Sequence, residues 1–156
     1  MIVIRPVTAT DEASLMTLAE QSGLFAPDHL AVVQETLTAY LSGTDDALWF
    51  TTDTTEPFGV LYCAPEVMAE GVWNGLMLIV HPDSHGQGIG TQLMQHAEQI
   101  LTAQGARLLL VETSSLDDFE RARRFYAKLG FSEEARIAHY YAEDDAKVVF
   151  AKRLTT

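Results

Sequence analysis

The sequence is poor in cysteine and lacks long apolar runs. Its one cysteine, Cys63, cannot form an intrachain disulfide. It lies in an apolar stretch, so we expect a buried thiol in a reducing cytoplasm. The longest apolar runs, residues 76–80 and 108–111, are far too short to cross a bilayer. The first residues lack the basic and apolar pattern of a signal peptide. We therefore expect a cytoplasmic protein with no membrane partner.

Basic residues are also scarce. The chain has 10 Lys and Arg against 22 Asp and Glu, which gives a net charge of −12. Only 2 of those 10, Arg5 and Arg107, precede residue 121. The negative field disfavours nucleic acid as the main partner and suits a cationic small molecule. Solubility alone is also a sufficient explanation for a net negative charge of this size.

The sequence contains no repeat, linker or low-complexity tract. With 156 residues and 47% hydrophobic content, it is expected to form a single domain spanning 1–156. The histidines have no metal-ligand spacing, which predicts no metal site.

The hydrophobic periodicity predicts a mixed α/β protein of element order βααβββαβαββ. Capping residues favour helices over 9–21, from Pro27 to Gly43, from the glycines near 88 to Gly105, and from Asp117 or Asp118 to Gly130, where Phe131 packs back on the last turn. The apolar runs favour strands at 2–4, 47–51, 58–63, 72–80, 107–112, 131–141 and 147–154.

The most informative segment joins the fourth strand to the third helix. Here Gly86, Gly88 and Gly90 alternate just before an amphipathic helix. Such a loop presents main-chain N–H groups at a helix N-terminus, where a phosphate or pyrophosphate binds well. It is a poor dinucleotide fingerprint because Thr91 stands where the third glycine belongs. No Gly-Lys-Ser/Thr follows, so the loop is not a P-loop.

Two motifs in register give this loop a more specific interpretation. The segment His85-Gly-Gln-Gly-Ile-Gly90, followed about 35 residues later by Phe125-Tyr-Ala-Lys-Leu-Gly-Phe131, resembles the GNAT superfamily of acetyl-CoA-dependent N-acetyltransferases. The element order matches that family over nearly the whole chain. The resemblance implies a single-layer, mixed, mostly antiparallel sheet flanked by helices on both faces.

The resemblance also implies how acetyl-CoA is held. The strand segment Leu78, Ile79 and Val80 would pair with the pantetheine arm as an added strand does. The loop would hold the pyrophosphate through the main chain of Gln87 to Thr91. In the family, the strands 72–80 and 107–112 splay apart to admit the thioester. The cofactor-binding residues expected in this way are Leu78, Ile79, Val80, His85, Gly86, Gln87, Gly88, Ile89, Gly90 and Thr91.

For catalysis, Tyr126 matches the family's general acid, a phenol that protonates the leaving thiolate. Many members place the general base on the strand before the glycines, but here that strand carries no acid. Glu112 is our candidate base, acting directly or through water, with Glu66 and Glu70 as alternatives. A core tyrosine and a solvated glutamate are the competing structural interpretations.

The sequence departs from the family pattern at two positions. His85 occupies the place of a Gln or Arg, and Phe119 stands where many members have an asparagine that contacts the cofactor. A protonated His85 would still touch a phosphate, and one of the arginines at 121, 123 and 124 is a candidate for another. Tyr140 and Tyr141 are candidates for the acceptor pocket, or else one lies in the core and one at the rim.

The resulting hypothesis is transfer of an acetyl group to a primary amine of a small molecule or peptide, by direct attack in a ternary complex. The alternatives are an acyltransferase that uses a longer acyl-CoA, a module that binds acetyl-CoA without turnover, and a nucleotide-dependent oxidoreductase. The last is disfavoured by the glycine spacing. Dimers are common in the family, so a homodimer is among the oligomeric states left open.

Overall fold

Within residues 2–155, which the computed structural model describes, seven strands form one sheet in the order β1-β2-β3-β4-β5-β7-β6. Antiparallel pairs predominate, and β4 runs parallel to β5. This is the mixed, mostly antiparallel α/β class that the sequence predicts. The strands are β1 (Ile4–Pro6), β2 (Leu48–Thr52), β3 (Gly59–Pro65), β4 (Val72–Val80), β5 (Leu108–Ser114), β6 (Ser132–Ala142) and β7 (Asp145–Arg153), and the α-helices are α1 (Glu12–Gln21), α2 (Pro27–Leu41), α3 (Ile89–Ala103) and α4 (Glu120–Lys128).

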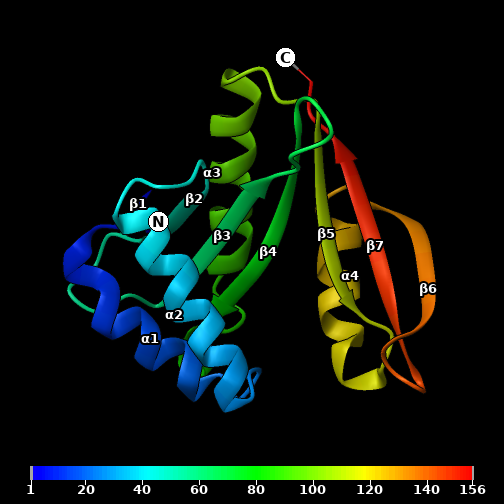
Figure 1. Ribbon diagram of the computed structural model, residues 1–156, viewed down its shortest axis with the longest axis horizontal. Coiled ribbons are helices and arrows are strands. Elements are labelled where there is room, and N and C mark those ends of the chain that lie inside the picture. Colours follow the sequence, from blue (N-terminus) through cyan, green and yellow to red (C-terminus); the bar gives the residue numbers. More distant parts are fainter. Residues whose placement is uncertain (1, 156) are drawn as a thin grey trace. The chain divides into compact units, whose positions relative to one another are not determined.

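The contacts divide the chain into two compact units, which are described in turn. The first comprises residues 1–64 and 77–99, and the second residues 65–76 and 100–156. In the first unit, α1 and α2 cover one face of β2 and β3, and α3 covers the other (Figure 1). Alternating side chains of β2 serve the two layers, because successive residues of a strand point to opposite faces. Trp49 joins the core beneath α1 and α2, whereas the ring of Phe50 meets His96 of α3 at 4.9 Å.

The apolar faces of the helices fall where the periodicity predicts. Leu15 and Leu18 of α1 and Leu37 of α2 are buried, and so are Leu93 and Ala97 of α3. Cys63 is fully buried, and burial raises the pKa of its thiol to about 12, so it is an inert core residue. The first unit therefore contains residues 77–80 of β4 and 89–99 of α3, which flank the glycine loop.

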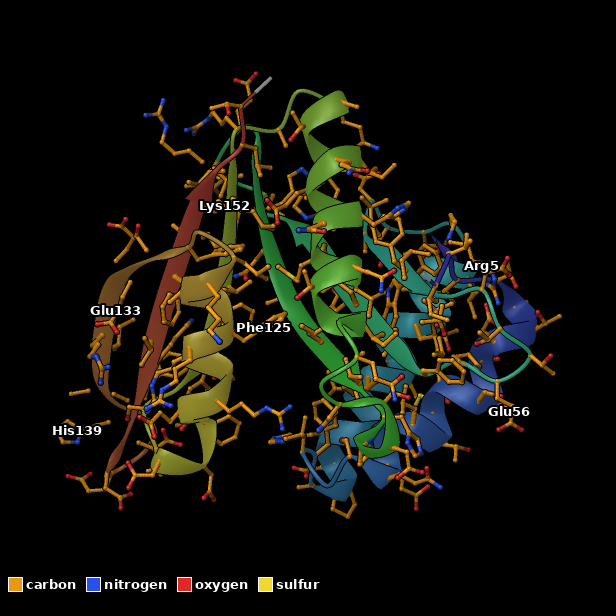
Figure 2. All side chains as sticks on the ribbon, turned by 180° about the vertical axis from the view of Figure 1, so that it is seen from behind. Arg5, Glu56, Phe125, Glu133, His139 and Lys152 are labelled. Carbon is orange, nitrogen blue, oxygen red and sulfur yellow. The ribbon has the colours of Figure 1, made fainter. Side chains whose placement is uncertain are left out.

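In the second unit, α4 covers one face of β5 and β7 (Figure 2). The parallel ladder between β4 and β5 runs from the pair Val72–Leu108 to the pair Gly75–Val111. The β5 strand continues to Ser114, two residues past its predicted end at Glu112, because β7 pairs with it through Ser114. Glu112 is therefore a residue within a ladder rather than a strand terminus.

The first predicted strand is also displaced. β1 covers Ile4–Pro6 rather than residues 2–4, because its antiparallel partner in β2 is the segment from Phe50 to Thr52. Main-chain pairing, which the local apolar pattern does not encode, sets both of these boundaries.

Candidate functional site

The glycine loop, residues 85–91, is anchored at its start by a short 3₁₀ turn, Pro82–Ser84. The main-chain N–H of His81 donates to the carbonyl of Phe58 at 2.6 Å, and the Nδ1 atom of His81 accepts from the N–H of Asp83 at 3.1 Å. The N–H of Ser84 donates to the carbonyl of His81. These bonds fix the point at which the chain leaves β4.

Two glycines then turn the chain into α3. Gly86 and Gly88 have φ values of +78° and +79°, which side chains other than glycine's rarely tolerate. A Cβ built on either glycine would meet no atom within 4 Å, so the main chain here is open on its outer side. The loop glycines thus serve conformation and access rather than tight packing within the protein.

The first N–H groups of α3 have no partner inside the helix, as at every helix N-terminus. The first helical bond runs from the N–H of Gln92 to the carbonyl of Gly88. Among the hydrogen bonds of residues 2–155, none is donated by the main-chain N–H groups of residues 86 to 91. The loop therefore presents a row of unpaired donors at the positive end of the helix dipole, an arrangement that binds phosphate.

The side chain of His85 contacts the end of β4. Its Nε2 atom lies 2.8 Å from the carbonyl oxygen of Val80, and because a carbonyl oxygen only accepts, Nε2 is assigned as the donor. The imidazole braces the glycine loop against the end of β4. The carbonyl of Val80, at the end of the segment expected to pair with pantetheine, thus already accepts one hydrogen bond.

Tyr126 lies on α4, in the second unit. Gly130 ends this helix with φ +94°, and its N–H donates to the carbonyl of Ala127 while the N–H of Phe131 donates to that of Tyr126, both at 3.1 Å. These two bonds define a Schellman cap, as the sequence predicts. The ring of Tyr126 is half-buried, and its centroid lies 6.0 Å from that of Phe131 and 5.9 Å from that of Phe150. The cap and these two rings fix the position of the phenol.

A polar cluster of five residues lies on the face of β5 and β7 opposite to α4. Its members are Glu66, Asn74, Glu112, Tyr140 and Lys147. The Nδ2 atom of Asn74 donates to Glu112 Oε2 at 2.7 Å and to Glu66 Oε1 at 3.2 Å. The ammonium of Lys147 lies 2.8 Å from Glu112 Oε1 and 4.4 Å from the centroid of the Tyr140 ring. The cluster therefore joins two carboxylates through one amide.

Register explains why these residues meet. Asn74 pairs with Leu110 and Lys147 with Ser114, so both share the face of β5 that carries Glu112. Phe150, which touches Tyr126, pairs with Val111 and belongs to the other face. The two proposed catalytic residues, Glu112 and Tyr126, are therefore on opposite faces of this part of the sheet.

The charges within the polar cluster favour a permanent ammonium on Lys147. Burial lowers its pKa, but the hydrogen bond and the charge of Glu112, with a contribution from Tyr140, outweigh this effect and leave the pKa raised. Burial and the nearby charge of Glu112 raise the pKa of Tyr141. Glu112 is thus a half-buried carboxylate with one cationic and one amide partner.

One expectation about neighbouring residues needs correction. Neither Tyr140 nor Tyr141 is a core residue, because β6 is the outer strand and every residue in it is exposed. Their rings meet edge to face at 5.0 Å. Of the two alternative bases, Glu66 joins the polar cluster. Glu70 is an exposed residue of the segment before β4, and its carbonyl accepts a hydrogen bond from Arg107.

The arginines of α4 differ in their roles. Arg123 donates to the carbonyls of Ser114 and Leu116, at 2.7 and 2.9 Å, so it joins α4 to the end of β5. Arg124 pairs with Glu120 at 2.9 Å. Arg121, Arg124 and Lys128 line an open hollow of about 500 Å³, together with Asp117, Asp118, Glu120 and Phe125 (Phe125 is labelled in Figure 2).

Sequence reasoning missed Asn74 and Lys147. Asn74 is 5% exposed in an otherwise apolar strand, and a buried polar residue in such a strand is the signal that would have found it. Lys147 carries no comparable signal, because only the β5–β7 register brings it to Glu112.

No helix among residues 2–155 has the length and apolar content needed to cross a bilayer. The described residues also contain no group of three or more His, Cys, Asp or Glu side chains arranged to hold a metal ion.

Comparison with known families agrees with this arrangement. The family model of the acetyltransferase (GNAT) domain matches residues 44–133. That match covers more than half of the chain and includes β4, the glycine loop and α4. The protein therefore belongs to the GNAT acetyltransferase family.

The matches to individual relatives cover different shares of the chain. N-alpha-acetyltransferase 30 of Schizosaccharomyces pombe is 33% identical over 85 residues, which are 53% of this chain and 55% of that protein. The match thus spans about half the length of this curated relative.

Among solved structures, a protein described as a GNAT-family acetyltransferase from Desulfovibrio desulfuricans superposes with a TM-score of 0.91 at 23% identity, over 99% of this chain and 100% of its own. The ribosomal-protein-S18-alanine N-acetyltransferase of Escherichia coli gives 0.79 at 18% identity, over 100% and 96%. An aminoglycoside 6′-N-acetyltransferase solved with coenzyme A gives 0.83 at 16% identity, over 99% and 98%. At these identities the likeness establishes the shared fold.

Proposed function

We propose that the protein transfers the acetyl group of acetyl-CoA to a primary amine of a small molecule or peptide, by direct attack in a ternary complex. The observation that carries this proposal is the row of unpaired main-chain N–H groups from Gly86 to Thr91 at the start of α3. These donors suit the pyrophosphate of coenzyme A, and Gly86 and Gly88 leave the approach to them open. The matched relatives named for N-acetylation, and the one solved with coenzyme A, support the choice of cofactor and reaction.

Bound acetyl-CoA would supply a thioester whose carbonyl carbon accepts the amine. The residues proposed to hold it are Leu78, Ile79 and Val80 of β4 and the loop from His85 to Thr91. His85 also bonds to the carbonyl of Val80, which stabilises the loop. Arg121, one of the arginines that the family resemblance makes a candidate for a phosphate contact, lines the hollow beside α4.

The two faces of the second unit suggest separate tasks for acid and base. The ladder between β4 and β5 covers the first four residues of each strand, up to Gly75 and Val111, and Glu112 is the next residue of β5. We propose that the thioester is reached there from both faces. Glu112 takes a proton from the attacking nitrogen on one face, directly or through water, and Tyr126 gives its phenolic proton to the departing sulfur on the other.

A ligand screen tests this proposal. Acetyl-CoA and CoA at one hundred times their dissociation constants should each stabilise the protein by about 2.7 kcal/mol, and NAD should give no shift. Free-thiol release is then measured with spermidine, kanamycin and an alanine-terminated peptide as acceptors. We expect at least one of them to be acetylated on a primary amine. A shift with NAD and none with either CoA species would refute the proposed cofactor.

The same assay addresses two alternatives. A module that binds acetyl-CoA without turnover would show the thermal shift and release no thiol with any acceptor. Butyryl-CoA and longer acyl donors are compared with acetyl-CoA to test for a wider acyl preference. The structure offers no specific observation in favour of either alternative.

A further inference from the structure

Asn74 holds an unusual position in the polar cluster. It is the only asparagine among the 156 residues, it is 5% exposed, and its amide nitrogen contacts both Glu66 and Glu112. Carboxylates accept hydrogen bonds and do not donate them when ionised. The opposite amide orientation would place Asn74 Oδ1 against two carboxylates, so the chemistry of its neighbours fixes which end of the amide faces them.

The oxygen of this amide has no partner. Asn74 Oδ1 is buried, and no donor for it exists among residues 2–155. Buried carbonyl oxygens are almost always paired, so an orphan of this kind signals a donor that comes from outside the chain. The ammonium of Lys147, the cation beside it, is already held by Glu112 and by the ring of Tyr140.

The charges of the polar cluster indicate what that donor is. Glu66 and Glu112 carry two negative charges and Lys147 one positive charge, which leaves the cluster with a net charge of −1. Lys147 also demonstrates that a primary ammonium suits these surroundings. An orphan acceptor within an acidic cluster therefore suits one further amine.

We propose that Asn74 Oδ1 accepts a hydrogen bond from the attacking nitrogen of the acceptor, and that Asn74 thereby selects primary amines. This inference rests on the proposed acetyl transfer. An amine that the acidic cluster attracts as an ammonium first releases one proton to solvent, and the resulting neutral primary amine has two N–H groups and a lone pair. One N–H donates to Asn74, the lone pair forms the C–N bond, and the C–S bond breaks with its electron pair passing to sulfur.

The protons balance in this sequence. The nitrogen loses its other proton to Glu112, and the sulfur receives a proton from Tyr126. Solvent then restores both side chains. A neutral secondary amine has a single N–H, so it cannot both keep the bond to Asn74 and release a proton to Glu112. The selectivity follows from this count of N–H groups.

The test compares matched acceptors that differ by one N–H. The pairs are an alanine-terminated peptide and its N-methyl form, and kanamycin and its 6′-N-methyl form. For whichever primary amine the wild-type protein acetylates, we expect kcat/KM to exceed that of its N-methyl partner by about 100-fold. Asn74→Leu keeps the volume and removes the acceptor, and should reduce this ratio at least tenfold.

Two further variants separate specificity from folding. Asn74→Gln keeps both the amide donor and the acceptor oxygen and should retain the preference for the primary amine even if turnover is slower. It also provides the readout if Asn74→Leu does not fold. Thr51→Val removes a different buried hydrogen bond, from Thr51 Oγ1 to the carbonyl of Gly59, and should leave the ratio unchanged.

The possible results are distinguishable. An unchanged ratio in Asn74→Leu, or an equal loss of rate for both members of a pair, would overturn the role of Asn74 and leave acetyl transfer standing. A wild-type ratio near one would do the same. If the wild-type protein acetylates none of the acceptors, the proposed function itself fails, and this inference fails with it.

Discussion

The glycine loop and the polar cluster are built in opposite ways. The glycine loop uses main-chain N–H groups within one short segment between β4 and α3, and its conformation depends on glycines with positive φ. The polar cluster uses side chains from five segments, the strands β4 to β7 and the turn before β4, which only the fold brings together. The first arrangement suits a ligand that many relatives share. The second depends on side-chain identity, so in our proposal a single substitution changes the preference for an acceptor.

The largest expected effect tests the glycine loop, which in our proposal binds its ligand through main-chain N–H groups. Gly88→Val places a β-branched residue at φ +79° and should move the N–H groups of the loop. We expect CoA to lose its thermal stabilisation, about 2.7 kcal/mol at one hundred times the wild-type dissociation constant. Calorimetric titration and thermal shift provide the measurement.

Gly105→Val is the matched control for Gly88→Val. Gly105 has φ +85° and equally open surroundings, but it lies just beyond the C-terminal end of α3. Both variants should lose about 1–2 kcal/mol of stability through backbone strain. Only Gly88→Val should lose CoA binding, and equal affinity in the two would remove the glycine loop from the cofactor site.

The next effect concerns Tyr126, which we propose acts in the chemical step rather than in binding. Tyr126→Phe should lower kcat by about 10²–10³-fold and leave the CoA dissociation constant within twofold, because only the proton donor is lost. Tyr40→Phe removes another phenol, one that donates to the carbonyl of Val7 at 2.8 Å, and should leave kcat unchanged. Wild-type turnover in Tyr126→Phe would exclude this residue as the general acid.

The sequence predicted the glycine loop well and the polar cluster poorly, for a physical reason. Glycines before a helix and a Schellman cap at Gly130 are local patterns, so Gly86, Gly88 and the position of Tyr126 on its helix could be predicted. The role of His85 could not, because its bond to Val80 depends on how the loop folds back. Asn74 and Lys147 flank Glu112 only through pairing with β4 and β7, which no local pattern encodes.

Two ion pairs of equal length sharpen the contrast between fold and chemistry. Asp11 Oδ2 lies 2.8 Å from Arg5, just as Glu112 Oε1 lies 2.8 Å from Lys147. Asp11 also accepts from the N–H of Thr8 at the start of the 3₁₀ turn that leads into α1. Asp11→Asn should therefore cost about 2 kcal/mol of stability and leave kcat unchanged. Glu112→Gln should instead lower kcat about tenfold or more.

The contribution of Asp11 to the free energy of unfolding depends on pH in a defined direction. The hydrogen bond from Arg5, opposed by burial and assisted by Thr8, lowers the pKa of Asp11 below its ordinary 3.8. This stabilisation is present above pH 3.8 and is lost as the pH falls toward the folded-state pKa. The free energy of unfolding is measured with urea at pH 6 and pH 2.5. The difference in this free energy between wild type and Asp11→Asn should be smaller at pH 2.5. A constant difference would contradict this assignment.

The smallest expected effect lies in the hollow beside α4. Arg121 is exposed there with Lys128, so its attraction for a phosphate of CoA is weak and screened by salt. Arg121→Ala should raise the dissociation constant of CoA about threefold at low ionic strength and have almost no effect in about 1 M salt. Arg153→Ala, an exposed arginine at the end of β7, is the control. Because the loop N–H groups provide most of the phosphate binding in our proposal, a loss in Arg121→Ala as large as that in Gly88→Val would show that side-chain charge, rather than the main chain, dominates cofactor binding.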